Sequence, residues 1–252
     1  MNRTARFLSL IVAISLVITG CGLIKSAGVE VITPSDVIIS EARDVSGFSS
    51  IDMTTVGEVV ITQGNTESVN ISGSDNLVPL IKTRVSNGTL IISTDRNINI
   101  IPLNLNKPNS LIITIELKDL SSLKVSGLGD IQMNALSTPS LSLDMSGAGR
   151  VQIKQLTTDS LVVNLSGLGS VELSGEAKQT TVDISGAGSV TAPDLKIQTV
   201  NVSVPGLGSA TLWVTDQLTG NISGAGSVSY YGNPQATTNS TGLGSFKSLG
   251  SK

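Results

Sequence analysis

A five-residue pattern of small residues recurs seven times in the second half of the chain, and it constrains the fold more than any other feature. The pattern is Ser/Pro/Thr-Gly-Leu/Ala-Gly followed by Asp, Arg or Ser, and its copies begin at Ser126, Ser146, Ser166, Ser185, Pro205, Ser223 and Thr241. Successive copies start 20, 20, 19, 20, 18 and 18 residues apart. A fixed period of this length is typical of a solenoid, in which each repeat buries its apolar face against its neighbours.

The residues on both sides of each pattern alternate between apolar and polar. Before Ser166, for example, Val163 and Leu165 flank the polar Asn164, and Val171 follows the pattern as the next apolar residue. A period of two residues indicates a strand with one face toward a core. At about 3.3 Å per residue, a repeat of this length traces roughly 60–65 Å, which suits one turn of a flattened β-helix. The sequence therefore predicts an all-β fold, a single-stranded parallel β-helix or β-solenoid with coils of about 20 residues.

The central residue of the pattern alternates strictly between large and small: Leu128, Ala148, Leu168, Ala187, Leu207, Ala225, Leu243. We expect these residues to form one column in which large and small side chains interdigitate as in a packed core, with Leu168 pointing inward. Two other interpretations are that both residue types are merely tolerated in a turn, and that the true repeat spans two coils. The glycines predict a sharp corner that needs a positive φ and no Cβ.

The first 20 residues are predicted to be a signal peptide. Arg3 and Arg6 form a positively charged start, and the apolar run of residues 7–17 is shorter than a transmembrane helix requires. The segment ends in Ile-Thr-Gly-Cys, which resembles a bacterial lipobox and includes the only cysteine of the chain, Cys21. The resemblance implies that Cys21 carries a thioether-linked diacylglycerol, is cleaved from the preceding residue and is acylated at its new amino terminus, for example by palmitate. An ordinary signal peptide with a chance cysteine is the alternative.

Residues 21–36 are then a polar tether, and residues 37–252 form the folded domain, with regular repeats over 122–248. Within this domain Ser86-Asn-Gly-Thr89 separates two alternating runs, and Asn-Gly in that place predicts a type I′ hairpin. A hairpin does not belong to a parallel solenoid, so we predict an antiparallel N-terminal cap that closes the first coil. The apolar run from Leu111 to Leu117 is expected to be the strand that enters the first regular coil.

Several short segments, together with the repeats, resemble a known bacterial family. They are Arg43-Asp-Val-Ser-Gly-Phe48, Asn76-Leu-Val-Pro79 and Asn87-Gly-Thr-Leu90-Ile-Ile. With the repeated Ser-Gly-x-Gly, they are similar to the putative auto-transporter adhesin head, or GIN, domain over about residues 37–249. The resemblance implies a single-stranded β-helix that is secreted or lipid-anchored.

The composition excludes several kinds of chemistry. The chain has no histidine and one cysteine, so Ser-His and Cys-His nucleophiles and ordinary zinc sites are excluded. A net charge of −3 with 14% charged residues argues against a nucleic-acid partner. The position after the second glycine reads Asp130, Arg150 and then only serine, which argues against calcium ions bound in every coil. We therefore expect no cofactor, no metal and no catalytic residue.

An outward-facing column of polar residues is the remaining candidate for a binding surface. It consists of Lys124, Asp144, Asn164, Asp183, Ser203 and Asn221, and we refer to it as the polar ladder. Asp144 and Asp183 lie two coils apart, at about 10 Å, which is at the edge of the carboxylate spacing of an inverting glycosidase. The simpler interpretation is a solvated ladder that supports the stacked coils.

The sequence thus favours a non-catalytic cell-envelope lipoprotein that is held to the membrane at Cys21, lies outside the cytoplasm and presents a β-solenoid to a glycan or an envelope protein. The alternatives are a polysaccharide-degrading β-helix lyase or hydrolase, and an envelope-stress or signalling accessory protein. In the final coil, Thr238-Asn-Ser240 replaces the usual apolar pattern. A polar last coil discourages end-to-end pairing, so we expect a monomer.

Overall fold

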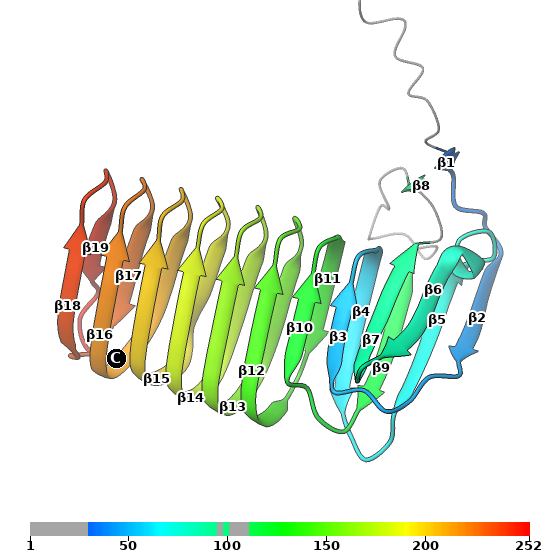
Figure 1. The fold of residues 1–252 in the computed structure, drawn as a ribbon, viewed down its shortest axis with the longest axis horizontal. Helices are drawn as coiled ribbons and strands as arrows, with labels where there is room; N and C mark the ends of the chain where they lie inside the picture. Colours follow the sequence, from blue (N-terminus) through cyan, green and yellow to red (C-terminus); the bar gives the residue numbers. More distant parts are fainter. Residues whose placement is uncertain (1–29, 95–97, 101–110) are drawn as a thin grey trace, which may run out of the picture.

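The computed structural model describes residues 30–94, 98–100 and 111–252. The predicted signal peptide, and Cys21 with most of the tether, lie outside the described residues. The described chain forms an elongated stack of β-coils with a wider sheet at its N-terminal end (Figure 1). Within the described residues, no helix has the length and apolar character needed to cross a membrane.

One sheet of 17 strands contains nearly all of the described structure, and a second sheet pairs β1 with β8. The elements are β1 (Glu30–Ile32), β2 (Ile38–Arg43), β3 (Ser50–Met53), β4 (Val56–Gln63), β5 (Ser68–Ser74), the 3-10 helix η2 (Val78–Leu80), β6 (Ile81–Ser86), β7 (Thr89–Thr94), β8 (Ile98–Ile100), β9 (Ile112–Leu117), β10 (Ser122–Val125), β11 (Leu128–Met133), β12 (Leu136–Met145), β13 (Arg150–Leu165), β14 (Ser170–Ile184), β15 (Ser189–Val204), β16 (Ser209–Ile222), β17 (Ser227–Tyr231), β18 (Gln235–Ser240) and β19 (Ser245–Ser248).

From β10 to β19 the coils stack in parallel and in register, as the repeat predicts. Asn164 on β13 pairs with Asp144 on β12 and with Asp183 on β14, each one repeat away in sequence. The long strands β13 to β16 run down one face, round one edge and up the other face, and the five-residue pattern forms the opposite edge (Figure 1). We call each copy of this pattern a corner. The predicted parallel β-solenoid with coils of about 20 residues is confirmed.

The core of the stack is built from the apolar residues that alternate on either side of each corner. Val163 and Leu165 before the Ser166 corner, and Val171 after it, are each at most 1% exposed. The equivalent residues of the other regular coils are buried in the same way, down to Val228. In the last coil Phe246 is only partly buried, although it still packs against the core. The two-residue period therefore predicted the inward positions of the strands correctly.

The corner glycines serve close stacking rather than unusual backbone angles. None of the fourteen corner glycines, all of them in the described chain, has a positive φ, so that part of the prediction is wrong. A Cβ on Gly167 would lie 2.0 Å from the carbonyl oxygen of Gly147 in the preceding coil, and one on Gly186 would lie 2.2 Å from that of Gly167. Each coil thus approaches its neighbour so closely at the corner that a side chain has no room.

The N-terminal cap contains the predicted hairpin. Strands β6 and β7 pair antiparallel, and Asn87 and Gly88 between them have φ values of 51° and 72°. Positive φ at both central residues is the signature of a type I′ turn. Strand β5 also pairs antiparallel with β2 and with β9, which completes the antiparallel part of the cap.

One coil of the stack comes from an unexpected part of the chain. Strands β3 and β4 lie directly against β10 and β11 in parallel, and Val56, Gly57 and Glu58 align with Leu128, Gly129 and Asp130. Strand β9 pairs with β4 and not with β11. The expectation that the Leu111–Leu117 run leads into the first regular coil is therefore wrong, because the coil formed by β3 and β4 lies between them.

The last coil is polar, as the sequence indicates. Every residue of β18 is exposed. The chain then turns back along the stack, with Leu249 N–H donating to Tyr230 O at 2.8 Å. Lys252 contacts the Asp194 carboxylate and lies 5.1 Å from the centre of the Trp213 ring.

Candidate binding surfaces

The polar ladder exists as a continuous row on one face of the solenoid. Pairing between successive strands places its six members next to each other in order, from Lys124 on β10 to Asn221 on β16. All six are exposed or partly exposed. At its first coil Lys124 lies 3.9 Å from the Asp52 carboxylate, which adds one acidic residue from β3 to the row.

Side chains of the polar ladder hydrogen-bond to one another between coils. The Asn164 amide donates to the Asp144 carboxylate at 2.7 Å, and Ser142 donates to the same carboxylate at 3.2 Å. Further along, the amide of Asn239, one coil beyond the ladder, donates to Asn221 at 3.0 Å. The bonds from Asn164 to Asp144 and from Asn239 to Asn221 link neighbouring coils, so at least part of the ladder supports the stack.

The two carboxylates of the polar ladder are separated by a coil that carries an amide. Asn164 lies between Asp144 and Asp183 in the register, and its amide nitrogen is bonded to Asp144. A glycosidase needs one carboxyl group to donate a proton and the other to activate water or attack the sugar. Here the Asp144 carboxylate accepts hydrogen bonds from Asn164 and Ser142, which is typical of a structural role in the polar ladder.

The second surface is the corner edge, where the structure overturns a prediction. The central corner residues do form one column, but the column faces solvent: Leu128, Leu168, Leu207 and Leu243 are 58%, 73%, 69% and 93% exposed. The expected interdigitation in a core, and the inward position of Leu168, are therefore wrong. The two glycines on either side turn the chain at the tip of the coil, so the central residue points away from both faces of the stack.

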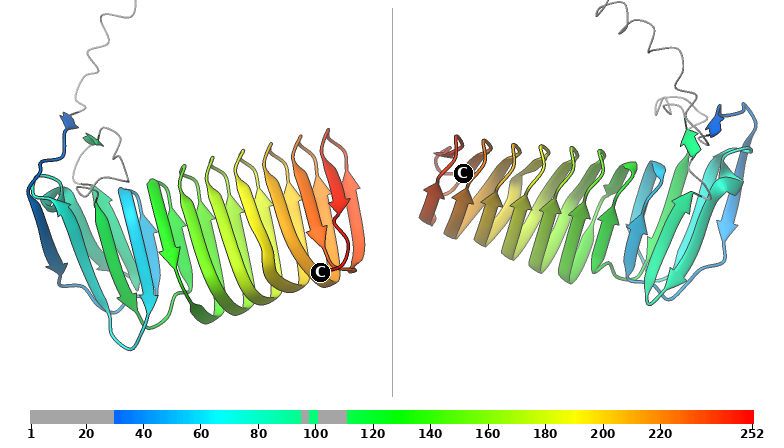
Figure 2. Two further views of the ribbon diagram at one scale, coloured as in Figure 1. Left: turned by 180° about the vertical axis from the view of Figure 1, so that it is seen from behind. Right: turned by 45° about the horizontal axis from the view of Figure 1, so that its top comes forward.

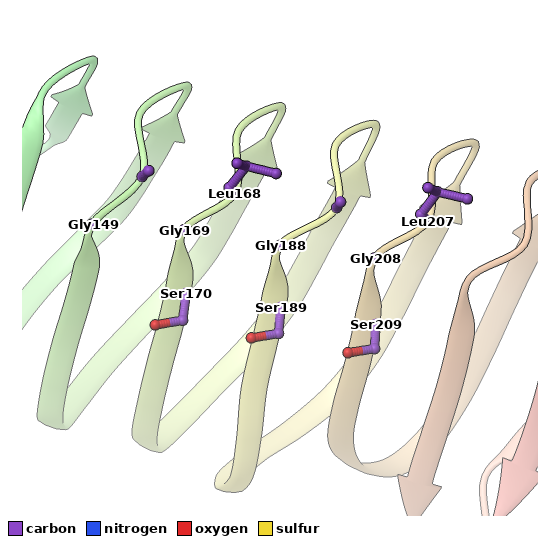
Figure 3. Close-up of a pocket in the computed structure, with 11 residues that line it drawn as sticks. Gly149, Leu168, Gly169, Ser170, Gly188, Ser189, Leu207, Gly208 and Ser209 are labelled. Atoms are coloured by element: carbon purple, nitrogen blue, oxygen red, sulfur yellow. The ribbon is translucent and has the colours of Figure 1, made fainter. Parts of the chain in front are cut away.

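We call this column the corner row; it consists of Leu128, Ala148, Leu168, Ala187, Leu207, Ala225 and Leu243. Between its leucines the surface is hollowed into a shallow groove of about 240 Å³, lined by corner residues of four successive coils from Ala148 to Ser209. Figure 3 shows Leu168 and Leu207 projecting from their corners, with Ser170, Ser189 and Ser209 further down the same side. The sequence contained the signal for this surface in the strict alternation of leucine and alanine.

Two observations concern chemistry. In the part of the chain that the structure describes, no group of three or more His, Cys, Asp or Glu side chains is arranged to hold a metal ion. The predicted lipid site at Cys21 lies outside that part, so the structure does not describe its surroundings.

The fold and these two surfaces define a parallel β-solenoid that is closed at one end by an antiparallel cap. The chain matches the model of the family described as putative auto-transporter adhesin, head GIN domain, over residues 47–234. The chain belongs to this family.

Solved structures agree with this assignment. A crystal structure of a putative adhesin from Bacteroides fragilis is 32% identical, with a TM-score of 0.81 over 86% of this chain and 100% of that one. A putative adhesin from Parabacteroides merdae is 21% identical, with a TM-score of 0.67 over 87% of this chain and 99% of that one. A putative lipid binding protein from Parabacteroides distasonis is 19% identical, with a TM-score of 0.68 over 87% of this chain and all of that one. The last two show the fold alone. No curated protein matches the chain.

Proposed function

We propose that this protein is a non-catalytic, lipid-anchored protein of the bacterial cell envelope, whose β-solenoid is an adhesion-like binding module outside the cytoplasm. The observation that carries the proposal is membership of the adhesin head family over residues 47–234, together with the crystal structure of a Bacteroides fragilis putative adhesin at 32% identity. An in-register stack adds a physical reason. It presents the same exposed polar groups at each coil, about 4.8 Å apart, which suits a ligand with its own repeat.

The anchor is proposed at Cys21. The lipobox-like Ile-Thr-Gly-Cys supports it, and so does the absence of another cysteine that could form a disulfide with Cys21. Mass spectrometry of the N-terminal peptide from membrane-extracted protein tests this part. We expect a peptide that begins at Cys21 and carries the mass of a diacylglycerol thioether and an amide-linked acyl chain. A Cys21→Ser variant should be released from the membrane, and an unmodified, uncleaved Cys21 would refute the anchor.

The polar ladder is the proposed ligand-binding face, with a glycan or another envelope protein as the ligand. A glycan array and a panel of envelope fractions can be probed with the full chain and with the variant Asn164→Ala, Ser203→Ala. The matched control is Thr191→Ala, Thr211→Ala, which removes two polar side chains from the other face of the same stack. We expect the ladder variant to lose binding and the control to keep it. Equal binding by both variants would remove the polar ladder from the proposal.

Cleavage of a polysaccharide by this protein would contradict the proposed function and indicate an enzyme. We expect no release of sugar from a panel of polysaccharides. Cleavage that is lost in both Asp144→Asn and Asp183→Asn would contradict the non-catalytic proposal and favour a glycoside hydrolase or lyase.

A further inference from the structure

Nothing in the fold explains why leucine occupies every second position of the corner row. The corner has the same backbone hydrogen bonds whether it carries alanine or leucine: Leu168 N–H donates to Gly147 O at 3.2 Å, and Ala187 N–H donates to Gly167 O at 3.2 Å. The leucines are 58% to 93% exposed, so they do not contribute to the core. A line of exposed leucines about 10 Å apart marks a surface that contacts something apolar.

The cost of removing the corner edge from water is reduced because much of its backbone is already paired. Besides the central residues, the amides of Ser170, Ser189 and Ser209 donate to the carbonyl groups of the preceding corners at 2.9, 3.1 and 3.1 Å. An unpaired amide in an apolar environment is strongly unfavourable. From the Ser166 corner onward, these bonds satisfy two amides in each corner, that of the central residue and that of the residue after the second glycine.

Charge is segregated to the other edge of the solenoid. From the Ser146 corner onward, the only charged corner residue is Arg150. The segments midway between successive corners, which run round the opposite edge (Figure 1), carry exposed charges of both signs. These are Lys154, Asp159, Glu176, Lys178, Asp194, Lys196 and Asp216. The corner edge therefore carries the exposed leucines among uncharged serines, with Asp130 and Arg150 as the only charged corner residues, and the opposite edge is charged.

The chain reaches the stack from the side of the corner edge. Strand β1, which begins at Glu30, lies on the side of the molecule toward which the corners point, and the views of Figure 2 agree. Cys21 precedes Glu30 by nine residues, which span at most about 30 Å. A lipid at Cys21 would thus hold the corner edge, rather than the charged edge, toward the bilayer.

A second copy of the chain fits the corner row less well than a bilayer does. The seven corners cover a strip about 30 Å long and about 10 Å wide, so a contact along it would bury roughly 300 Å² per partner, whereas a stable dimer needs about 800 Å² per partner. A protein that is already tethered to a bilayer needs no minimum contact area to lie on it. Each exposed leucine that enters the interfacial region lowers the free energy of binding in proportion to the apolar area that it buries.

We propose that the corner row is a membrane-contact edge, along which the tethered solenoid lies on the lipid surface with Leu128, Leu168, Leu207 and Leu243 in the interfacial region. This inference rests on the proposed lipid anchor for its geometry. It places the long axis of the stack parallel to the bilayer and turns the charged edge toward the aqueous side.

Site-specific fluorescence on the full chain tests the proposal. The lipidated protein is reconstituted into vesicles of phosphatidylethanolamine and phosphatidylglycerol. A thiol-reactive, polarity-sensitive dye is placed at Ala187→Cys, within the corner row, or at Lys178→Cys, on the charged edge. Cys21 is blocked by its lipid, so only the new thiol reacts. With brominated lipids, we expect at least fivefold stronger quenching at residue 187 than at residue 178.

Removing the leucines should abolish this difference. Leu168→Ser combined with Leu207→Ser should reduce quenching at residue 187 to the level of residue 178. The matched control, Val60→Ser combined with Val162→Ser, removes two partly exposed valines from the flat faces and should leave quenching unchanged. Equal, weak quenching at both dyes in the parent protein overturns the proposal.

Flotation of the same vesicles separates the two proposals. Protein that floats but shows no quenching at residue 187 keeps the anchor and refutes the membrane-contact edge. If the chain proves unlipidated, Cys21→Ser protein carrying the dye is added to vesicles: a blue shift at residue 187 alone supports the edge without the anchor, and no shift overturns it. Concentration-dependent sedimentation without lipid that disappears in the double leucine variant would instead assign the corner row to a second copy.

Discussion

An aspartate placed at either of two positions in the same coil tests which side chain faces the core and which faces solvent. Val171 is 0% exposed and pairs in register with Val151 and Val190 of the adjacent coils. Leu168, three residues earlier, is 73% exposed. We therefore expect Val171→Asp to destabilise the solenoid severely and Leu168→Asp to leave its stability almost unchanged.

The magnitude follows from burial. Val171→Asp loses the burial of a valine, about 1.5–3 kcal/mol, and adds an unpaired carboxyl group in the core, which costs at least a further 2 kcal/mol even when it takes up a proton. The sum, at least about 3.5–5 kcal/mol, is comparable with the entire stability of a marginally stable domain. Leu168→Asp removes no buried contact, and surface substitutions of this kind change stability by about 0.5 kcal/mol or less.

The assay is guanidinium unfolding followed by far-ultraviolet circular dichroism. We expect the Leu168→Asp midpoint to match that of the parent, and Val171→Asp either to be unfolded in buffer or to lose a part of the transition that corresponds to the coils around it. The reasoning fails if both variants unfold at the same denaturant concentration, because the corner leucine and the strand valine would then be equally buried.

Three further predictions concern the stack. Gly167→Ala places a methyl group 2.0 Å from a backbone carbonyl oxygen of the preceding coil and should lower stability by about 1–3 kcal/mol, as measured by thermal unfolding; an unchanged melting temperature would contradict the close approach. Asn164→Ala should cost about 0.5–1 kcal/mol in the same assay through its lost bond to Asp144, and no effect would show that this bond does not support the stack. Thr238→Val with Ser240→Val makes the last strand apolar and should cause concentration-dependent association in sedimentation, whereas a dimer already present in the parent would contradict the expected monomer.

The repeat pattern was sufficient to predict most of the solenoid. Alternation across Val163, Asn164 and Leu165 determines which side chains face the core, because a strand has only two faces. The Asn87-Gly88 turn likewise predicted its own hairpin, since few other sequences accept positive φ at both positions.

The corner row could not be oriented from the pattern. A residue between two glycines at the tip of a turn belongs to neither face of the stack, so the two-residue period does not extend to it. The alternation of large and small residues therefore predicts a core position for leucines that are in fact exposed. The glycines themselves were explained by backbone angle, although the structure shows that contact between coils excludes a side chain. That contact depends on the distance between coils, which local sequence does not reveal.

The coil formed by β3 and β4 was missed because its neighbours are distant in sequence. Thr54-Thr-Val-Gly-Glu58 lacks the first glycine of a corner, which Thr55 replaces, and has Val56 and Glu58 where corners have other residues. Residues 64–121 separate the strand that follows it from the regular coils. Strands β3 and β4 pair with β7 and β9 on one side and with β10 and β11 on the other. These partners are distant in sequence, so the pairing depends on tertiary packing.

The coil formed by β3 and β4 affects the order in which parts of the molecule fold and unfold. Strand β4 can pair with both of its neighbours, β9 and β11, only after the ribosome has released the chain past Met133. The earliest strands therefore remain incomplete while nearly half of the domain is synthesised. Once formed, the coil joins the cap to the stack through contacts of high sequence separation, and neither can dissociate alone.

The last coil has a neighbour on one side only. Amide hydrogen exchange should therefore be fastest in β18 and β19 and slow progressively toward β4, and removal of C-terminal coils should shorten the solenoid without unfolding its capped end.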